Sequence, residues 1–262
     1  MSTLSYTLRD SATMLRRDVR HSLRRLSMTL SGLGTPTIMM VLFNYVFGGA
    51  IGAGLDGAAH GAYINYLAPA IIIMTVSSGC ATTAINLCME LSEGIITRFR
   101  TMAISRASVL TGQVIGSLIR TLLSACLVLG VALLMGFRPS ASPIAWIAAL
   151  GFIALVTLAI TWMGVLFGLV GKTPAGANSL SLIFLLLVFT SSAFVSTDSM
   201  AGWVRWFAEY QPFTPIIDTV RGLLLGTPIG GNSVALAIAW CVGLTLAGYL
   251  GARAIYNHTP VQ

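Results

Sequence analysis

Two short motifs in the sequence resemble phosphate-binding loops, but neither meets the requirements of one. Residues 171–173 read Gly-Lys-Thr, which is how a Walker A loop ends, yet Leu166 stands where that loop has its first glycine. Residues 52–57 match the spacing G-x-G-x-x-G, yet no strand–helix–strand pattern surrounds them. The sequence therefore predicts no nucleotide site here, and we expect the isolated chain not to hydrolyse ATP.

Side chains that commonly form catalytic or metal sites are also poorly placed. The three histidines lie outside the long apolar segments, and the sequence contains no H-E-x-x-H motif. The cysteines have neither C-x-x-C spacing nor a nearby histidine, so we expect them to be small, buried and reduced. They are Cys80, Cys88, Cys126 and Cys241. We expect no catalytic residue, no metal and no cofactor bound by this chain.

Ionisable residues are almost absent from the apolar segments. The eight acidic residues lie in loops or at segment ends, whereas a proton- or sodium-coupled carrier usually needs a carboxylate near mid-membrane. Arg120 is the exception, because an arginine at the centre of a membrane helix costs on the order of 2.5–3.5 kcal/mol to insert. One hypothesis makes Arg120 a pathway or gating residue. The other has its helix extend into the cytoplasm, where Arg120 reaches the interface or pairs with Glu90 or Glu93.

Composition places the chain in the membrane. Of its 262 residues, 56% are hydrophobic and only 9% are charged, whereas soluble domains average about 25% charged. The mean hydropathy is +0.86. The net charge of +7 resides in the flanks of the apolar segments, which is typical of orientation signals and not of a nucleic-acid surface. We predict an all-α integral membrane protein forming a single transmembrane domain over residues 1–262.

Six apolar segments have roughly the length of about 20 residues that a bilayer requires. They cover residues 34–52, 64–88, 109–135, 144–170, 178–195 and 233–256. Placing both termini in the cytoplasm puts most lysines and arginines on the inner side, as membrane proteins prefer. We therefore predict a multi-pass protein of the bacterial cytoplasmic (inner) membrane with both termini inside.

Two further segments are amphipathic or too short to cross. Residues 8–30 carry leucines on one helical face and arginines on the other, which predicts a helix lying in the lipid interface. Residues 199–226 carry aromatic residues and prolines, followed by an apolar stretch too short to span the membrane. We predict a re-entrant or interfacial helical segment there, with a plain external loop as the alternative.

A polar, arginine-bearing segment at residues 90–108 separates the second and third apolar segments. Arg98, Arg100 and Arg106 alternate with apolar residues, which predicts an amphipathic helix on the cytoplasmic side. Such an element commonly contacts a soluble partner. The alternative is that its arginines only fix topology and lie on lipid head groups.

The order of these features resembles the ABC-2 type permeases, and more narrowly the daunorubicin-resistance-type drug-efflux permeases of actinobacteria. The segments that carry the resemblance span nearly the whole chain: Tyr-Ile-Asn-Tyr-Leu-Ala-Pro at 63–69, Gly-Ile-Ile-Thr-Arg-Phe-Arg at 94–100, Ile-Ser-Arg at 104–106, Gly-Phe-Arg-Pro at 136–139, Ser-Ser-Ala-Phe at 191–194, and Tyr-Gln-Pro-Phe-Thr at 210–214 with Asp218 and Arg221-Gly222. The sequence departs from that pattern at Ala103, where a proline is usual, and at Gln211, where asparagine is common.

The resemblance implies a non-catalytic permease half that pairs with a second permease subunit, identical or related. Two copies of a separate ABC ATP-binding subunit, carrying ATP and Mg, would drive outward movement of an amphipathic drug or lipid-like substrate. The coupling residues that it implies are Glu93, Gly94, Arg98, Phe99, Arg100, Met102, Ile104 and Arg106. The candidate pathway or gate residues are Arg120, Asp218 and Arg221.

Other functions remain open at this stage. Within the same class, the substrate could be a lipid-linked glycan or a lipid. An ion-coupled carrier or channel that uses no ATPase belongs to a different class. An intramembrane enzyme is disfavoured, because no nucleophile or metal constellation is present in the sequence.

Overall fold

The structure is a computed structural model, and it describes residues 26–47, 61–92, 106–195, 197 and 200–258. Within these residues every regular element is helical and no strand occurs, which confirms the all-α prediction. The elements are α2 (Leu26–Leu42), η1 (Phe43–Phe47), α4 (Gly61–Ser92), α6 (Arg106–Leu134), α7 (Pro143–Val170), α8 (Pro174–Phe189), α9 (Gly202–Tyr210), α10 (Phe213–Leu225) and α11 (Gly231–His258).

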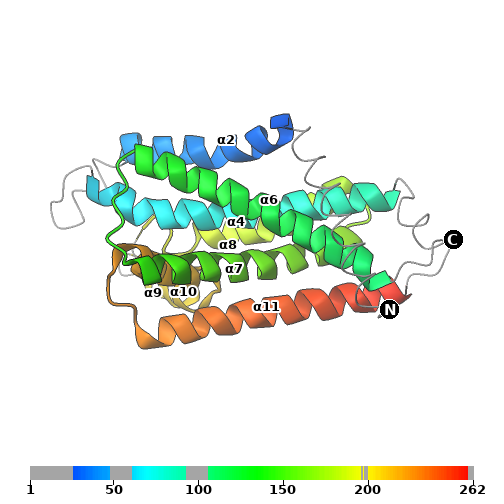
Figure 1. Cartoon of the computed structure of the whole chain (residues 1–262). Coiled ribbons are helices and arrows are strands. Elements are labelled where there is room, and N and C mark those ends of the chain that lie inside the picture. Colours follow the sequence, from blue (N-terminus) through cyan, green and yellow to red (C-terminus); the bar gives the residue numbers. More distant parts are fainter. Residues whose placement is uncertain (1–25, 48–60, 93–105, 196, 198–199, 259–262) are drawn as a thin grey trace, which may run out of the picture.

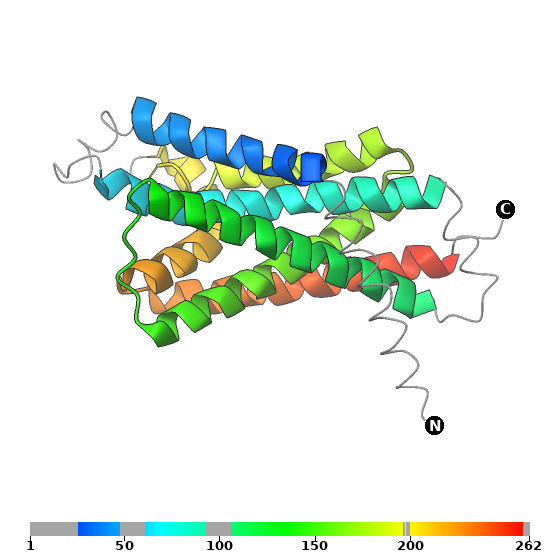
Figure 2. The same cartoon turned by 45° about the horizontal axis from the view of Figure 1, so that its top comes forward.

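The long helices run side by side in alternating directions (Figure 1 and Figure 2). The short helices α9 and α10 lie together at one end of this bundle, which we call the α9–α10 end. Helices α2, α6 and α8 run toward that end, whereas α4, α7 and α11 run away from it. The last residues of α4 and the first residues of α6 therefore lie at the opposite end.

Four described helices are long and apolar enough to cross a bilayer: Tyr63–Ser92, Gly112–Leu134, Pro143–Val170 and Gly231–Ile255. They agree with four of the six predicted segments. Helix α8 is apolar but has only 16 residues, and turns follow it at residues 190–194. The chain is thus a multi-pass membrane protein.

The N-terminal boundary differs from the prediction. The first apolar segment was expected at residues 34–52, but α2 begins at Leu26 and continues through Pro36 into η1. Residues 26–30, expected in the interface helix, therefore belong to α2. The rest of that expected helix, residues 8–25, lies outside the described residues, as do residues 48–52.

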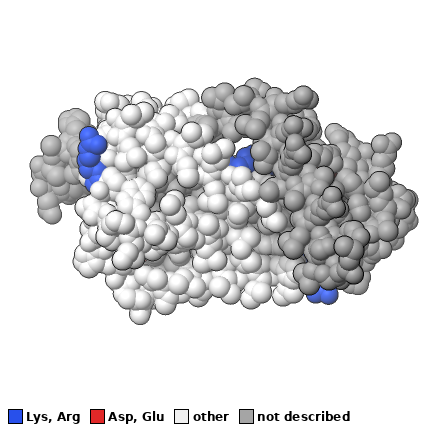
Figure 3. Space-filling view, viewed as in Figure 1, with Lys and Arg blue, Asp and Glu red and all other residues white. Residues whose placement is uncertain are grey.

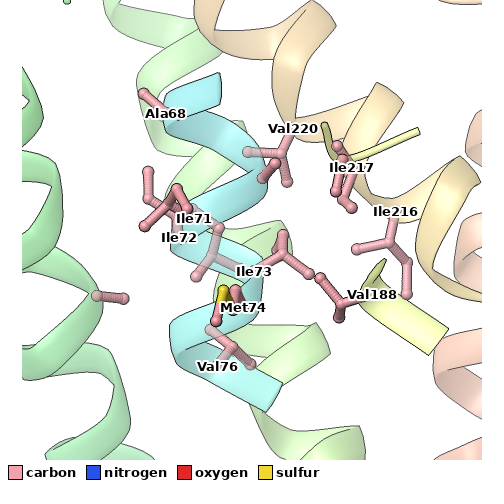
Figure 4. Packing of buried hydrophobic residues seen from close by; sticks show 14 of the residues in the cluster. Ala68, Ile71, Ile72, Ile73, Met74, Val76, Val188, Ile216, Ile217 and Val220 are labelled. Atoms are coloured by element: carbon pink, nitrogen blue, oxygen red, sulfur yellow. The ribbon is translucent and has the colours of Figure 1, made fainter. Parts of the chain in front are cut away.

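Helix α4 forms the centre of the core. Its residues from Tyr63 to Val76 include an almost unbroken set of fully buried apolar side chains. Figure 4 shows that Ile73 of α4 lies beside Val188 of α8 and Ile216 of α10. These contacts anchor α10 beside α4, so the position of α10 is set by the main core.

Glycines allow α7 to pack directly on its neighbours. A Cβ at Gly164 would lie 2.8 Å from the carbonyl oxygen of Cys80 in α4, and one at Gly248 of α11 would lie 2.7 Å from the backbone of Trp162 in α7. Small residues at such crossings let membrane helices approach closely. Gly164 and Gly168, four residues apart on α7, both lie against the backbone of α4.

The described outer surface exposes many large apolar side chains. On the face shown in Figure 3, the described surface carries Lys and Arg at only a few small places. Leucines such as Leu127 of α6 and Leu246 of α11 are exposed. Cys126 is exposed as well, contrary to the expectation that all four cysteines are buried, because none of the described helices covers the side of α6 that bears it. The other three are buried. An apolar outer surface suits contact with lipid.

Candidate functional site

A polar cluster ties three elements together at the α9–α10 end, and Arg221 of α10 is its centre. One guanidinium nitrogen of Arg221 (Nη1) donates to Asp218 Oδ1 at 2.7 Å. The other, Nη2, donates to the carbonyl oxygen of Ser192 at 3.0 Å. The guanidinium carbon lies 3.8 Å from the ring centroid of Tyr66 in α4, a cation–π geometry. One side chain thus joins α10 to α4 and to the turn that follows α8.

Ser192 links the remaining members of this cluster by hydrogen bonds. The Ser192 hydroxyl donates to Asp218 Oδ1 at 2.8 Å, and the Tyr66 hydroxyl donates to the Ser192 carbonyl oxygen at 2.7 Å. The backbone N–H of Ser192 donates to the hydroxyl of Thr214 at 3.2 Å. We call these five residues, Tyr66, Ser192, Thr214, Asp218 and Arg221, the Arg221 cluster.

Helical spacing explains how α10 presents its three members. Thr214, Asp218 and Arg221 are four and three residues apart, so they share one face of the helix. The opposite side of α10 is anchored by buried apolar side chains such as Ile216 and Val220 (Figure 4). Helix α10 ends at Leu225, and Gly226 follows it with a φ of 65°, the left-handed conformation common at helix C-termini.

The cluster combines opposite charges in a partly buried place. The Arg221 side chain is 14% exposed and that of Asp218 is 38% exposed. Burial raises the pKa of the Asp218 carboxyl above its ordinary value, while the Arg221 guanidinium and the Ser192 hydroxyl act in the opposite direction. The pair has no net charge when both groups are ionised, and its hydrogen bonds join α10 to the turn that follows α8.

Segments that are far apart in the sequence converge on this cluster. Residues 63–69, 191–194 and 210–214 each contribute a member. The backbone N–H of Arg138 donates to Asn65 Oδ1 at 3.1 Å, which brings the α6–α7 connection beside the same end of α4. Most segments that carry the family resemblance therefore meet at one place.

The structure does not bring Arg120 to this cluster. Arg120 lies near the middle of α6, and its Nη2 donates to Ser117 Oγ at 3.1 Å. A Cβ at Gly79 of α4 would lie 2.7 Å from Oγ1 of Thr121, the residue next to Arg120, so α4 and α6 lie close together at this level. Tyr66 precedes Gly79 by 13 residues on the same helix, so Arg120 and the cluster differ by about 20 Å in level.

Comparison with known proteins identifies the family. The sequence model of the ABC-2 type transporter family matches residues 10–225. The chain belongs to the ABC-2 type transporter family. This confirms the resemblance drawn from the motifs.

Three relatives of this ABC-2 type transporter are informative. A daunorubicin resistance ABC transporter permease protein of Streptomyces coeruleorubidus is 25% identical over 222 residues, which cover 84% of this chain and 74% of the relative. A probable doxorubicin resistance ABC transporter permease protein of Mycobacterium tuberculosis is 25% identical over 209 residues, covering 80% and 74%. A putative transport permease of Porphyra purpurea is 24% identical over 221 residues, covering 83% and 74%.

The implied coupling segment of this ABC-2 type transporter bridges α4 and α6. Helix α4 ends at Ser92 and α6 begins at Arg106, both at the end of the bundle opposite the Arg221 cluster (Figure 1). Of the coupling residues named above, Arg106 is the first residue of α6. The others lie outside the described residues: Glu93, Gly94, Arg98, Phe99, Arg100, Met102 and Ile104.

Among the described residues, no group of three His, Cys, Asp or Glu side chains could hold a metal. Asp218 and Arg221 were identified from the sequence as site residues, whereas Tyr66, Ser192 and Thr214 were not. The sequence signal that could have indicated these three residues is their position inside the motif segments. Local spacing could not, because Tyr66 and Ser192 are 126 positions apart.

Proposed function

We propose that this chain is the membrane-spanning permease subunit of an ATP-driven ABC exporter. The observation that carries the proposal is the family match over residues 10–225, which includes the segment joining α4 to α6 and the Arg221 cluster. A separate ABC ATP-binding subunit supplies the energy, with ATP and Mg bound on that partner. Two such subunits and a second permease subunit, identical or related, complete the transporter.

The proposed substrate is an amphipathic drug or lipid-like molecule moved out of the cell. The names of two relatives, which refer to daunorubicin and doxorubicin resistance, support an amphipathic drug. Export of a lipid-linked glycan or a lipid is the alternative within the same class. An ion-coupled carrier or channel is the alternative outside it.

We propose six crossings with both termini in the cytoplasm of a bacterial inner membrane. Besides the four long helices, α2 continues directly into η1, and a helical run from Leu26 to Phe47 is about 33 Å long, enough for the hydrocarbon core. Helix α8 would be the fifth crossing, completed by the turns after Phe189. The alternating directions of these six elements support this topology (Figure 1).

The same topology makes α9 and α10, within residues 199–226, a re-entrant pair on the external side. Its support is the depth at which the two helices lie against the crossings. Trp240 Nε1 donates to the carbonyl oxygen of Tyr210 at 3.1 Å, and Trp240 is nine residues, or about 14 Å, beyond the start of α11. Ile216 packs in the same cluster as Ile73, which is about 18 Å beyond the start of α4.

The proposed mechanism separates energy input from the exit gate. The segment at residues 90–108 is the coupling helix that a groove of the ATP-binding subunit receives. The Arg221 cluster lies at the other end of α4 and is the candidate external gate, through Asp218 and Arg221. Arg120 lies between the two levels on α6, where a pathway role is compatible with its position.

Transport into inside-out membrane vesicles tests the proposal. Vesicles that contain the chain and its ATP-binding subunit should accumulate doxorubicin when ATP is added, and an ionophore that abolishes ion gradients should not prevent this. Vesicles with either subunit alone should accumulate none. Uptake that follows an imposed proton or sodium gradient without ATP would overturn the proposal. ATP-dependent movement of a fluorescent phospholipid but not of doxorubicin would favour the lipid alternative.

A further inference from the structure

The connection between α6 and α7 contacts two of the helices that carry the Arg221 cluster, and we call its residues 137–142 the strap. The backbone N–H of Arg138 donates to Asn65 Oδ1 at 3.1 Å, near the start of α4. The hydroxyl of Ser140 donates to the carbonyl oxygen of Leu225, the last residue of α10. The strap therefore joins the beginning of α4 to the end of α10, and Figure 1 shows the connection running along the α9–α10 end of the bundle.

Ser140 satisfies a carbonyl group that α10 cannot satisfy by itself. The last four carbonyl groups of an α-helix have no partner within the helix, and that of Leu225 is one of them. A Cβ at Gly226 would lie 3.5 Å from Ser140 Oγ, which is an ordinary contact distance, so the strap lies directly against the end of α10. Leu225 follows Arg221 by one helical turn. The strap thus fixes α10 one turn beyond the Arg221 cluster.

The strap is held firmly to the end of α6. The backbone N–H of Phe137 donates to the carbonyl oxygen of Ala132 at 2.9 Å, and that of Gly136 donates to the carbonyl oxygen of Leu133 at 3.2 Å. Gly136 has a φ of 104°, and this combination is the Schellman motif that closes many helices. Phe137 is fully buried in the main core, and the ring of Pro139 restricts the backbone that follows. A displacement of the end of α6 therefore carries the strap with it.

Helix α6 connects the strap to the opposite end of the bundle. It runs without a proline from Arg106 to Leu134, a length of about 42 Å. Proline is a common cause of helix kinks, and α2 and α4 contain Pro36 and Pro69. Helix α6 can therefore move as one body between residues 90–108, the proposed coupling segment, and the strap.

We propose that Ser140 is a positioning residue through which movement of α6 reaches α10. When the coupling segment displaces α6, the strap moves with the end of that helix. The hydrogen bond from Ser140 to Leu225 then carries the end of α10 along, and the Arg221 cluster is displaced with it. The inference rests on the proposed coupling role of residues 90–108. It deepens the proposed mechanism, because it names the link between the energy input and the candidate external gate.

The amount of doxorubicin moved per ATP hydrolysed tests this link in proteoliposomes that contain the chain and its ATP-binding subunit. Ser140→Ala removes the hydroxyl group. We expect native-level subunit association and ATP hydrolysis, while transport per ATP falls about three- to tenfold, the factor that corresponds to one ordinary hydrogen bond. Ser140→Thr keeps a hydroxyl donor and should retain most of the coupling. The matched control is Ser142→Ala, because Ser142 Oγ accepts from Ala145 within the first turn of α7 and does not join the strap to α10, so transport per ATP should not change.

A covalent bridge between the same two elements provides a second test. In a cysteine-free background, Ser140→Cys/Thr227→Cys is bridged by a short bifunctional methanethiosulfonate reagent. Transport per ATP should be low before bridging, return toward the native value when the bridge forms, and fall again when the bridge is reduced.

Two outcomes overturn the role of Ser140. One is native transport per ATP in Ser140→Ala. The other is loss of transport on bridging, because the strap would then have to separate from α10 during transport. Absence of ATP-dependent transport by the native chain with its ATP-binding subunit would instead overturn the proposed function, and the inference with it.

Discussion

Removing the guanidinium of Arg221 should destabilise the protein more than removing any comparable surface arginine. Arg221→Met keeps the length and apolar stem of the side chain but eliminates its donors and its charge. The variant loses the bonds to Asp218 Oδ1 and to the Ser192 carbonyl oxygen, together with the stacking on Tyr66. It also leaves the carboxylate of Asp218 without its cation.

The magnitude follows from these contacts. A hydrogen bond from a charged donor contributes about 1.5–3 kcal/mol, and the cation–π contact adds about 0.5–2 kcal/mol. Because Asp218 is 38% exposed, water screens the ion pair and reduces its contribution toward about 1 kcal/mol. We expect a loss of about 3 kcal/mol in the free energy of unfolding, and a fall in Tm of about 6–12 °C for a chain of this size.

Thermal unfolding of the purified protein in detergent measures this effect. The matched control is Arg205→Met, because Arg205 pairs with Glu209 in an exposed ion pair and should contribute less than about 1 kcal/mol. Asp218→Asn retains an oxygen that can accept from Ser192 and should cost about 1 kcal/mol. The double variant should fall short of additivity by about 1 kcal/mol, because both single changes break the same pair. A melting temperature for Arg221→Met equal to that of Arg205→Met would refute the reasoning.

Three further predictions concern packing, coupling and energy supply. Gly248→Ala should destabilise the protein by about 1–3 kcal/mol, because its Cβ would lie 2.7 Å from the backbone of Trp162, whereas Gly243→Ala on the same helix meets nothing within 4 Å and should be neutral or slightly stabilising in the same melting assay. Phe99→Ala should reach the membrane at the native level but lose about 2 kcal/mol of affinity for the ATP-binding subunit, and Arg98→Lys should be milder; unchanged co-purification and export would exclude residues 90–108 as the coupling element. The purified chain should neither bind nor hydrolyse ATP, and activity that co-elutes with the pure chain would contradict this.

The long apolar segments were predictable because lipid leaves few alternatives. Helices α4, α6, α7 and α11 agree with the predicted segments to within a few residues, since an uninterrupted apolar run of such length has to satisfy its backbone groups internally. The start of α2 was less predictable. Gly34 and Pro36 commonly mark helix boundaries, yet the helix runs through both from Leu26.

Helix orientation and long-range pairing could not be read from the sequence. Cys126 lies in an apolar run, but composition does not say which side of α6 packs, and its side chain is exposed. The family resemblance singled out Asp218 and Arg221 as candidate site residues. It could not indicate that Tyr66 and Ser192, 126 positions apart, complete their cluster, because that contact depends on how α4, α8 and α10 pack.

Reconstitution from purified components tests the central claim most directly. The chain and its ATP-binding subunit are placed together in proteoliposomes, and doxorubicin movement is followed after ATP and Mg are added on the side of the ATP-binding subunit. The account predicts transport only when both subunits and hydrolysable ATP are present, with no response to ionophores. Transport by the chain alone, driven by an ion gradient, would contradict it.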